Sequence, residues 1–127
     1  MAEYALAPLE QPDWSLSPDD LAERILQHWP AARVEIETDR SAPMALHALI
    51  PFDPPRRELG IAMVWTGDYL SLDPADPDTA AEFAAWVVNQ IPTGGPPLHI
   101  LPKERWDPMP IDRATPEQAI AAHLSAA

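Results

Sequence analysis

The sequence predicts an α+β fold, in which a mostly antiparallel sheet of four to five strands carries two helices on one face. Between residues 59 and 73, large apolar residues recur at every second position on either side of a glycine, which is typical of a β-hairpin. Directly afterwards, residues 77–91 carry apolar side chains at helical spacing, which is typical of an amphipathic helix. We expect this helix to cover the hairpin and to form the centre of the core.

The hairpin turn is predicted at Gly67 and Asp68, because glycine supplies the positive φ that a two-residue loop requires. This loop places Met63 opposite Leu72 and puts the large apolar residues of both strands on one face. Trp65 belongs to the same alternating run and is therefore expected in the core.

The beginning of the chain predicts an arm followed by a helix. Residues 1–16 hold large apolar residues among prolines, so we expect an extended arm with one edge strand at Glu3–Ala7. The following segment predicts a helix over 17–29, with Ser17 as its N-cap and Pro18 at the first helical position. This helix should pack beside the later one, on the same face of the sheet.

Three further segments have the pattern of strands. Arg33–Thr38 alternates charged and apolar residues and predicts a half-exposed strand. Met44–Pro51 is apolar almost throughout and predicts a central strand covered on both faces. Leu98–Leu101 predicts a short strand whose place in the sheet the sequence leaves open. Lys103–Arg113 is expected to be irregular, with Trp106 tethering it to the core.

Two helix starts carry capping signals. The helix over 77–91 can be capped by Asp76, with a proline at its first position, or by Thr79, and the sequence does not separate these starts. A weaker C-terminal helix is predicted over 115–125, because the same pattern of cap and proline recurs there. Only two large apolar residues of this last segment share a face, so we expect it to pack at an edge.

Composition limits the function classes. The chain has 127 residues, which fits a single domain over 1–127, and it has no cysteine, which excludes disulfides and thiolate metal sites. Its 8 basic and 20 acidic residues give a net charge of −12, which argues against nucleic-acid binding because phosphate contacts need a basic face. No apolar run has the length of a membrane span, so we expect no membrane contact and take the cytoplasm as the default location.

The acidic residues are unevenly distributed, and this predicts a protein partner. Six acids and no Lys or Arg lie between residues 58 and 102. Such a surface can attract a basic partner, although acidic residues also serve solubility. A tryptophan on the flank of the helix over 77–91 can anchor an interface. The predicted partner-binding residues are Asp68, Asp76, Asp78, Glu82 and Trp86.

No set of residues predicts a catalytic or metal site. His47 and His99 lie on predicted strands and could meet across the sheet as a ligand or acid/base pair, although a strand histidine satisfied locally is commoner. The acids around Asp76 lack the glycine and the alternating ligands of a calcium loop, and helix capping explains them better. Ser71 follows no nucleophile elbow, and Lys103 has no evident activating neighbour. We therefore expect no cofactor, no metal and no catalytic residue.

Four motifs carry a resemblance to known sequences, and they are Ser41–Pro51, Leu70–Asp73, Ala81–Trp86 ending at Ile91–Pro92, and Thr115–Gln118. Together they resemble a group of small bacterial α+β proteins to which no activity is assigned. The resemblance covers roughly residues 17–124. It implies an intact α+β unit and implies no site, cofactor or partner.

These observations favour a non-enzymatic protein-binding or accessory protein, of the immunity-inhibitor or secretion-chaperone kind. One alternative is a small enzyme or ligand carrier with a pocket near His47, His99 and Asp68. Another is a homodimeric structural module, because residues such as Leu49 and Ala62 would lie on a second sheet face that is too apolar to remain in water. Either the last helix and the N-terminal arm cover that face, or a second subunit does.

Overall fold

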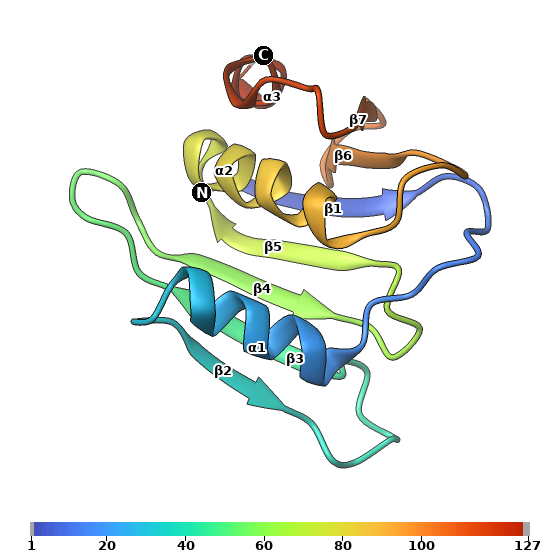
Figure 1. Cartoon of the computed structure of the whole chain (residues 1–127). Coiled ribbons are helices and arrows are strands. Elements are labelled where there is room, and N and C mark those ends of the chain that lie inside the picture. Colours follow the sequence, from blue (N-terminus) through green and yellow to red (C-terminus); the bar gives the residue numbers. More distant parts are fainter. Residues whose placement is uncertain (1, 126–127) are drawn as a thin grey trace.

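The computed structural model of the chain describes residues 2–125 and shows an α+β fold with one antiparallel sheet and three helices (Figure 1). The sheet has seven strands rather than four to five, in the spatial order β2-β3-β4-β5-β1-β6-β7. None of the described helices has both the length and the apolar character needed to cross a membrane. The elements are β1 (Ala2–Pro8), α1 (Pro18–His28), β2 (Arg33–Ile36), β3 (Leu46–Ile50), β4 (Leu59–Met63), β5 (Leu70–Ala75), α2 (Pro77–Val87), the 3₁₀ turn η1 (Val88–Gln90), β6 (Leu98–Pro102), β7 (Met109–Ile111) and α3 (Glu117–Ser125).

Strand β1 corrects the prediction of an N-terminal arm with an edge strand. It lies inside the sheet, between β5 and β6, and is antiparallel to both. Ala5 stands opposite Ser71 on one side and Leu101 on the other. Tyr4 and Leu6 point into the core and are buried. The sequence missed this position because both partner strands lie far along the chain and leave no local signal.

Strand β7 corrects the prediction of an irregular segment over Lys103–Arg113. It is an edge strand beside β6, and Ile111 is buried. Pro110 is tolerated in its middle because a proline lacks only a hydrogen-bond donor that an edge strand can leave unpaired. Trp106, expected to tether this segment to the core, is instead 73 % exposed.

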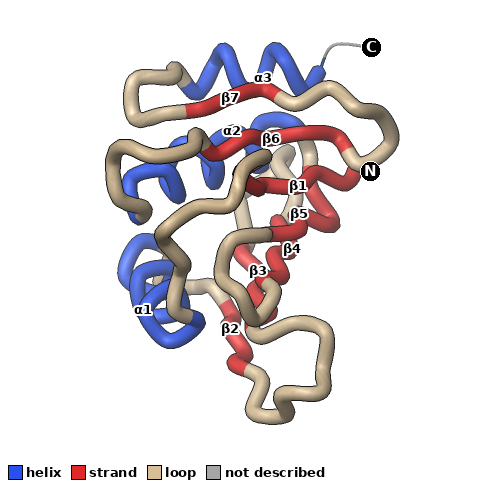
Figure 2. The backbone as a smooth tube through the Cα atoms, turned by 90° about the vertical axis from the view of Figure 1, so that its right-hand side faces the viewer, coloured by secondary structure: helices blue, strands red, loops and turns tan. Residues whose placement is uncertain are grey.

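Helices α1 and α2 lie on one side of the sheet, and α3 runs along its β7 edge, as Figure 2 shows. Helix α1 contacts β2 and β3, α2 contacts β5 and β1, and α3 lies against α2 and the edge strand β7. Strand β3 is therefore covered on one face only, which corrects the prediction for Met44–Pro51. Leu46 and Ile50 are buried under the helices, whereas His47 on the other face is exposed.

The β4–β5 hairpin forms, but its register differs from the prediction. Met63 pairs with Leu70, not with Leu72. The connection is longer than two residues, since the Val64 amide donates to the Tyr69 carbonyl oxygen at 3.2 Å and closes a wider loop. A shift of two residues leaves every side chain on its original face, so the core side of the hairpin is as expected.

The longer loop moves Trp65 out of the core, which corrects its predicted place. Its side chain is half-buried, and its indole N–H donates to the Ala42 carbonyl oxygen at 2.7 Å. The Arg40 guanidinium lies over the indole ring, 4.6 Å from its centroid. Gly67 has the positive φ expected of the turn, 72°, and a Cβ there would lie 2.3 Å from the Leu16 carbonyl oxygen.

The two main helices begin where their capping residues predict. The Ser17 hydroxyl accepts a hydrogen bond from the amide of the first turn of α1, and Pro18 follows. Of the two predicted starts of α2, the structure has the first, with Asp76 as N-cap and Thr79 completing a reciprocal capping box. The α-helix ends at Val87 and continues as η1, so it is shorter than the predicted range 77–91.

The core lies between the helices and the sheet. The Trp29 and Phe83 rings stack between α1 and α2, with centroids 5.9 Å apart, and Phe83 is fully buried. Helix α3 contributes Ile120 and Leu124, which are buried against its neighbours at the β7 edge. The main sheet contacts of α2 are with β5 and β1, so this helix covers one strand of the predicted hairpin and the inserted strand β1 rather than both hairpin strands.

Candidate functional site

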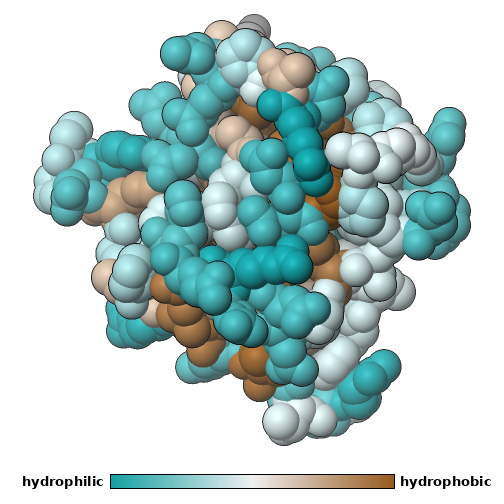
Figure 3. Space-filling model, viewed as in Figure 1, coloured by the Kyte–Doolittle hydropathy of each residue, from teal (hydrophilic) through white to brown (hydrophobic). Residues whose placement is uncertain are grey.

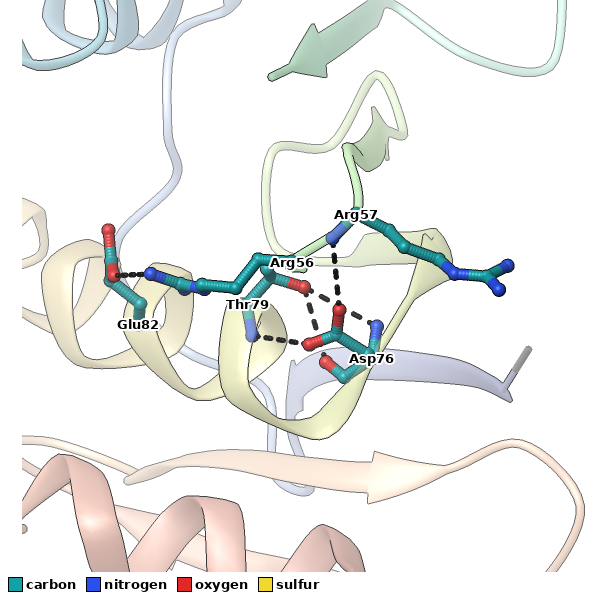
Figure 4. A network of polar contacts seen from close by, with 5 residues as sticks. All are labelled: Arg56, Arg57, Asp76, Thr79 and Glu82. Carbon is teal, nitrogen blue, oxygen red and sulfur yellow. Dashed lines mark hydrogen bonds and ion pairs between the residues drawn. The ribbon is translucent and has the colours of Figure 1, made fainter. Parts of the chain in front are cut away.

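The predicted partner-binding acids at the start of α2 are engaged in contacts within the fold (Figure 4). One Asp76 carboxylate oxygen accepts the Thr79 amide at 2.9 Å, and the other accepts the Arg57 amide at 3.5 Å. Glu82 accepts a charged hydrogen bond from Arg56 at 3.0 Å. These contacts hold the first turns of α2 against the connection between β3 and β4.

Asp78 lies beside this network, in an acidic cleft between α2 and α3. Asp78, Glu82 and Glu117 line it, with Arg56 as the basic residue among its lining side chains. The cleft has a volume of about 250 Å³. The Arg56 guanidinium also lies over the Phe52 ring, 4.4 Å from its centroid, so this cation is held by the fold on two sides.

Asp68 lies away from the other predicted acids. It is in the β4–β5 turn, where its carboxylate accepts the Thr66 hydroxyl at 2.6 Å. Asp76 follows the opposite end of β5, a strand of six residues. At a strand rise of about 3.3 Å per residue, roughly 20 Å separates the two ends. The structure therefore splits the predicted acidic site into two parts.

Trp86 lies between α1 and α2, where it packs against other aromatic rings. Its centroid is 5.0 Å from that of Trp29, 5.6 Å from that of Phe83 and 5.8 Å from that of His28. The side chain is half-buried and is one wall of a hollow that Arg24 also lines. Its main contacts join the two helices, and only its outer part is accessible to a partner.

The two strand histidines are not brought together. Both lie on the face of the sheet that carries no helix, His47 on β3 and His99 on β6. Strands β4, β5 and β1 separate them, so four strand spacings of roughly 4.8 Å, about 19 Å, lie between. His99 has its Nδ1 atom 3.2 Å from the Pro97 carbonyl oxygen, which is a local contact.

The second sheet face, which the sequence predicts to be apolar, is helix-free in the structure. Its central positions are small, because Ala62, Ser71 and Ala5 stand side by side on neighbouring strands. The two segments expected to cover it lie elsewhere: α3 packs on α2, and the N-terminal segment is β1 itself. Within residues 2–125, no helix lies on this face (Figure 2).

An apolar groove of about 500 Å³ crosses this face along β1 and β6. Ala5 and Ala7 line it on β1, and Leu9 follows at the next alternate position. Leu9 and Trp106 are 48 % and 73 % exposed, which makes them two of the four large apolar residues that are exposed in the described part of the chain. By contrast, Figure 3 shows the helix side, where polar side chains interrupt the apolar patches.

The groove also contains the single lysine of the sequence. Lys103 follows β6, and its Nζ atom donates to the Ser71 hydroxyl at 2.5 Å, reaching across β1. The sequence shows no neighbour for Lys103, because Ser71 is 32 residues away along the chain. A sequence signal for the groove does exist. Leu101, Lys103 and Arg105 occupy every second position, as do Ala5, Ala7 and Leu9, and alternate residues of a strand share one face.

Among the described residues, Tyr4 and Asp39 have shifted pKa values, and neither residue lines the groove. Burial, reinforced by the charge of Asp76, raises the pKa of the Tyr4 phenol. Hydrogen bonds from the hydroxyl and amide of Ser41 lower the pKa of Asp39. Within residues 2–125, no three His, Asp or Glu side chains come together as a metal site. Comparisons with protein-family models, curated proteins and solved structures find no match for this chain.

Proposed function

We propose that this chain is a non-enzymatic accessory protein that binds a protein partner on the helix-free face of its sheet. The observation that carries the proposal is the groove along β1 and β6, which is lined by small residues of the sheet and by the exposed side chains of Leu9 and Trp106. Exposed apolar surface of this kind is costly in water and is typical of interaction sites. Tryptophan is among the residues that most often anchor protein interfaces.

The acids predicted from the sequence support partner binding less well than the groove does. Asp76 caps α2, Glu82 pairs with Arg56, and Asp68 accepts a hydroxyl in a distant turn. A partner that took these carboxylates would have to replace contacts that already stabilise the fold. The net charge of −12 nevertheless favours association with a basic protein at long range.

Of the two kinds of accessory protein expected, the secretion-chaperone kind fits the groove better. An immunity-type inhibitor blocks one folded partner and needs a broad complementary surface. A chaperone-like protein holds an extended segment, and this groove follows the direction of a strand through Ala5, Ala7 and Leu9. Extended chains present alternate side chains to such a surface.

Position-specific photo-crosslinking tests the proposal. A photoreactive amino acid is placed in the full chain at position 106 in the groove, at position 86 between the helices, or at position 26. Leu26 is the matched control, because it is 43 % exposed on α1, close to the value of Leu9. After illumination in a native lysate, we expect a discrete crosslinked protein from position 106, identified by mass spectrometry, and weaker capture when Leu9→Ser is added.

Three results would contradict the groove as the partner site. Equal capture from positions 106 and 26 would mean nonspecific adhesion. Capture from position 86 alone would place the partner on the helices, near the acidic residues predicted from the sequence. No captured protein at low or at high salt would contradict a protein-binding function altogether.

A homodimeric module is a second candidate, favoured by the same uncovered sheet face. Two copies that faced each other through this surface would exclude water from Ala62, Leu101 and Trp106 in both. Sedimentation of the full chain over a range of concentrations tests this alternative. A dimer that Trp106→Ser converts to a monomer would support the module and exclude an open groove, whereas a monomer throughout would exclude the module.

A further inference from the structure

The groove has an apolar end and a charged end, where Glu104 and Arg105 line it beside Lys103. Leu9 and Tyr69 line one end, while the Lys103 ammonium lies over the row of Ser71 and Ala5. From Ala5 to Leu9 the chain advances four residues, which is about 14 Å in an extended strand. A ligand that fills the groove therefore meets an apolar contact and a positive charge at a defined separation.

The Lys103 charge has no carboxylate partner in residues 2–125, where its polar contact is the Ser71 hydroxyl. Two of the arginines differ from it, because Arg56 pairs with Glu82 and Arg113 donates to the Ile91 carbonyl oxygen. A serine hydroxyl that accepts one hydrogen bond can still donate its own proton. Lys103 and Ser71 together therefore offer a cation and a hydroxyl donor to a carboxylate, and Ser71 is almost buried in the sheet.

We infer that the groove binds an extended acidic–apolar peptide segment, in which a large apolar residue stands four positions from an Asp or Glu. The apolar side chain contacts Leu9 and Tyr69, and the carboxylate pairs with Lys103. This pairing is a local contact, whereas the net charge of −12 acts on the whole partner at long range. Residues four apart in an extended chain point to the same side, so both can face the sheet. This inference rests on the proposed function and adds a specificity to it.

Selection of peptides and a charge-matched pair of variants test the inference. A display library of short random peptides is selected on the full chain, and enriched peptides are measured by fluorescence anisotropy. We expect enrichment of an aromatic or aliphatic residue four positions from Asp or Glu. Replacing that acid by its amide should weaken binding about tenfold, the size expected for a charge-assisted hydrogen bond.

Variants assign the effect to Lys103. In Lys103→Gln, the acidic peptide and its amide counterpart should bind equally, while Lys103→Arg should keep the difference. Arg33→Gln is the matched control, because Arg33 lies on the same face in the far edge strand β2, and its loss changes net charge by the same amount. We expect Arg33→Gln to keep the preference for the acidic peptide.

The outcomes separate this inference from the proposed function. Enriched peptides that are basic, or that bind Lys103→Gln with an unchanged preference for the acid, would overturn the inference. If position 106 still captured a protein in the crosslinking experiment, the proposed function would stand without the acidic specificity. A dimer closed over this face would overturn the inference, because a second copy would then occupy the groove.

Discussion

The indole ring of Trp29 stacks on the phenyl ring of Phe83, with centroids 5.9 Å apart and planes 27° from parallel, and so joins α1 to α2. Phe83 has no exposed surface. We predict that Phe83→Ala lowers the free energy of unfolding by about 3–5 kcal/mol, because it removes the ring and leaves a cavity. Urea denaturation measures the loss. Leu26→Ala, at an exposed site on α1, is the control and should change stability by less than about 1 kcal/mol.

The capping box at the start of α2 gives a second prediction. Asp76→Ala removes the acceptor of the Thr79 amide and should lower the free energy of unfolding by about 1 kcal/mol. Asp76→Asn keeps a side-chain oxygen at the N-cap and should retain most of the stability. Both are measured by urea denaturation. An Asn variant as unstable as the Ala variant would mean that the charge, not the cap, is what the fold requires.

The buried phenol of Tyr4 predicts a change of stability at alkaline pH. Its pKa is raised in the folded protein by burial and by Asp76, and an unfolded tyrosine titrates near pH 10. A raised pKa means that the stabilising contribution is complete below about pH 10 and is lost as the pH rises through the folded value. Unfolding curves between about pH 8 and pH 11 should therefore fall more steeply for the wild type than for Tyr4→Phe. Parallel curves would contradict the assignment.

Local patterns in the sequence were sufficient for much of the fold. The caps at Ser17 and Asp76, the glycine turn at Gly67 and the buried face of α2 depend on residues close together in the chain. The positions of β1 and β7 depend on partners that are distant in sequence, and their prolines obscure the strand pattern. Because β1 is a strand inside the sheet, the N-terminal segment does not cover the second sheet face as a loose arm would.

The candidate site was harder to predict because side-chain partners are not visible in a sequence. Glu82 looks like a free surface acid until Arg56, 26 residues away, is placed against it. Lys103 looks isolated until β1 brings it over Ser71. Trp106 looks like a core residue by composition, yet the loop before β7 leaves it exposed.

Solvent access to the helix-free face tests the central claim most directly. In NMR spectra of the full chain, a soluble gadolinium chelate speeds the relaxation of methyl groups near the surface. We predict strong relaxation for Ala7 and Leu101, which line the groove, and little for Leu6 and Leu72, which are buried under the helices. Methyl groups of Ala7 and Leu101 as protected as those of Leu72 would show that this face is closed in solution and would contradict an open binding groove.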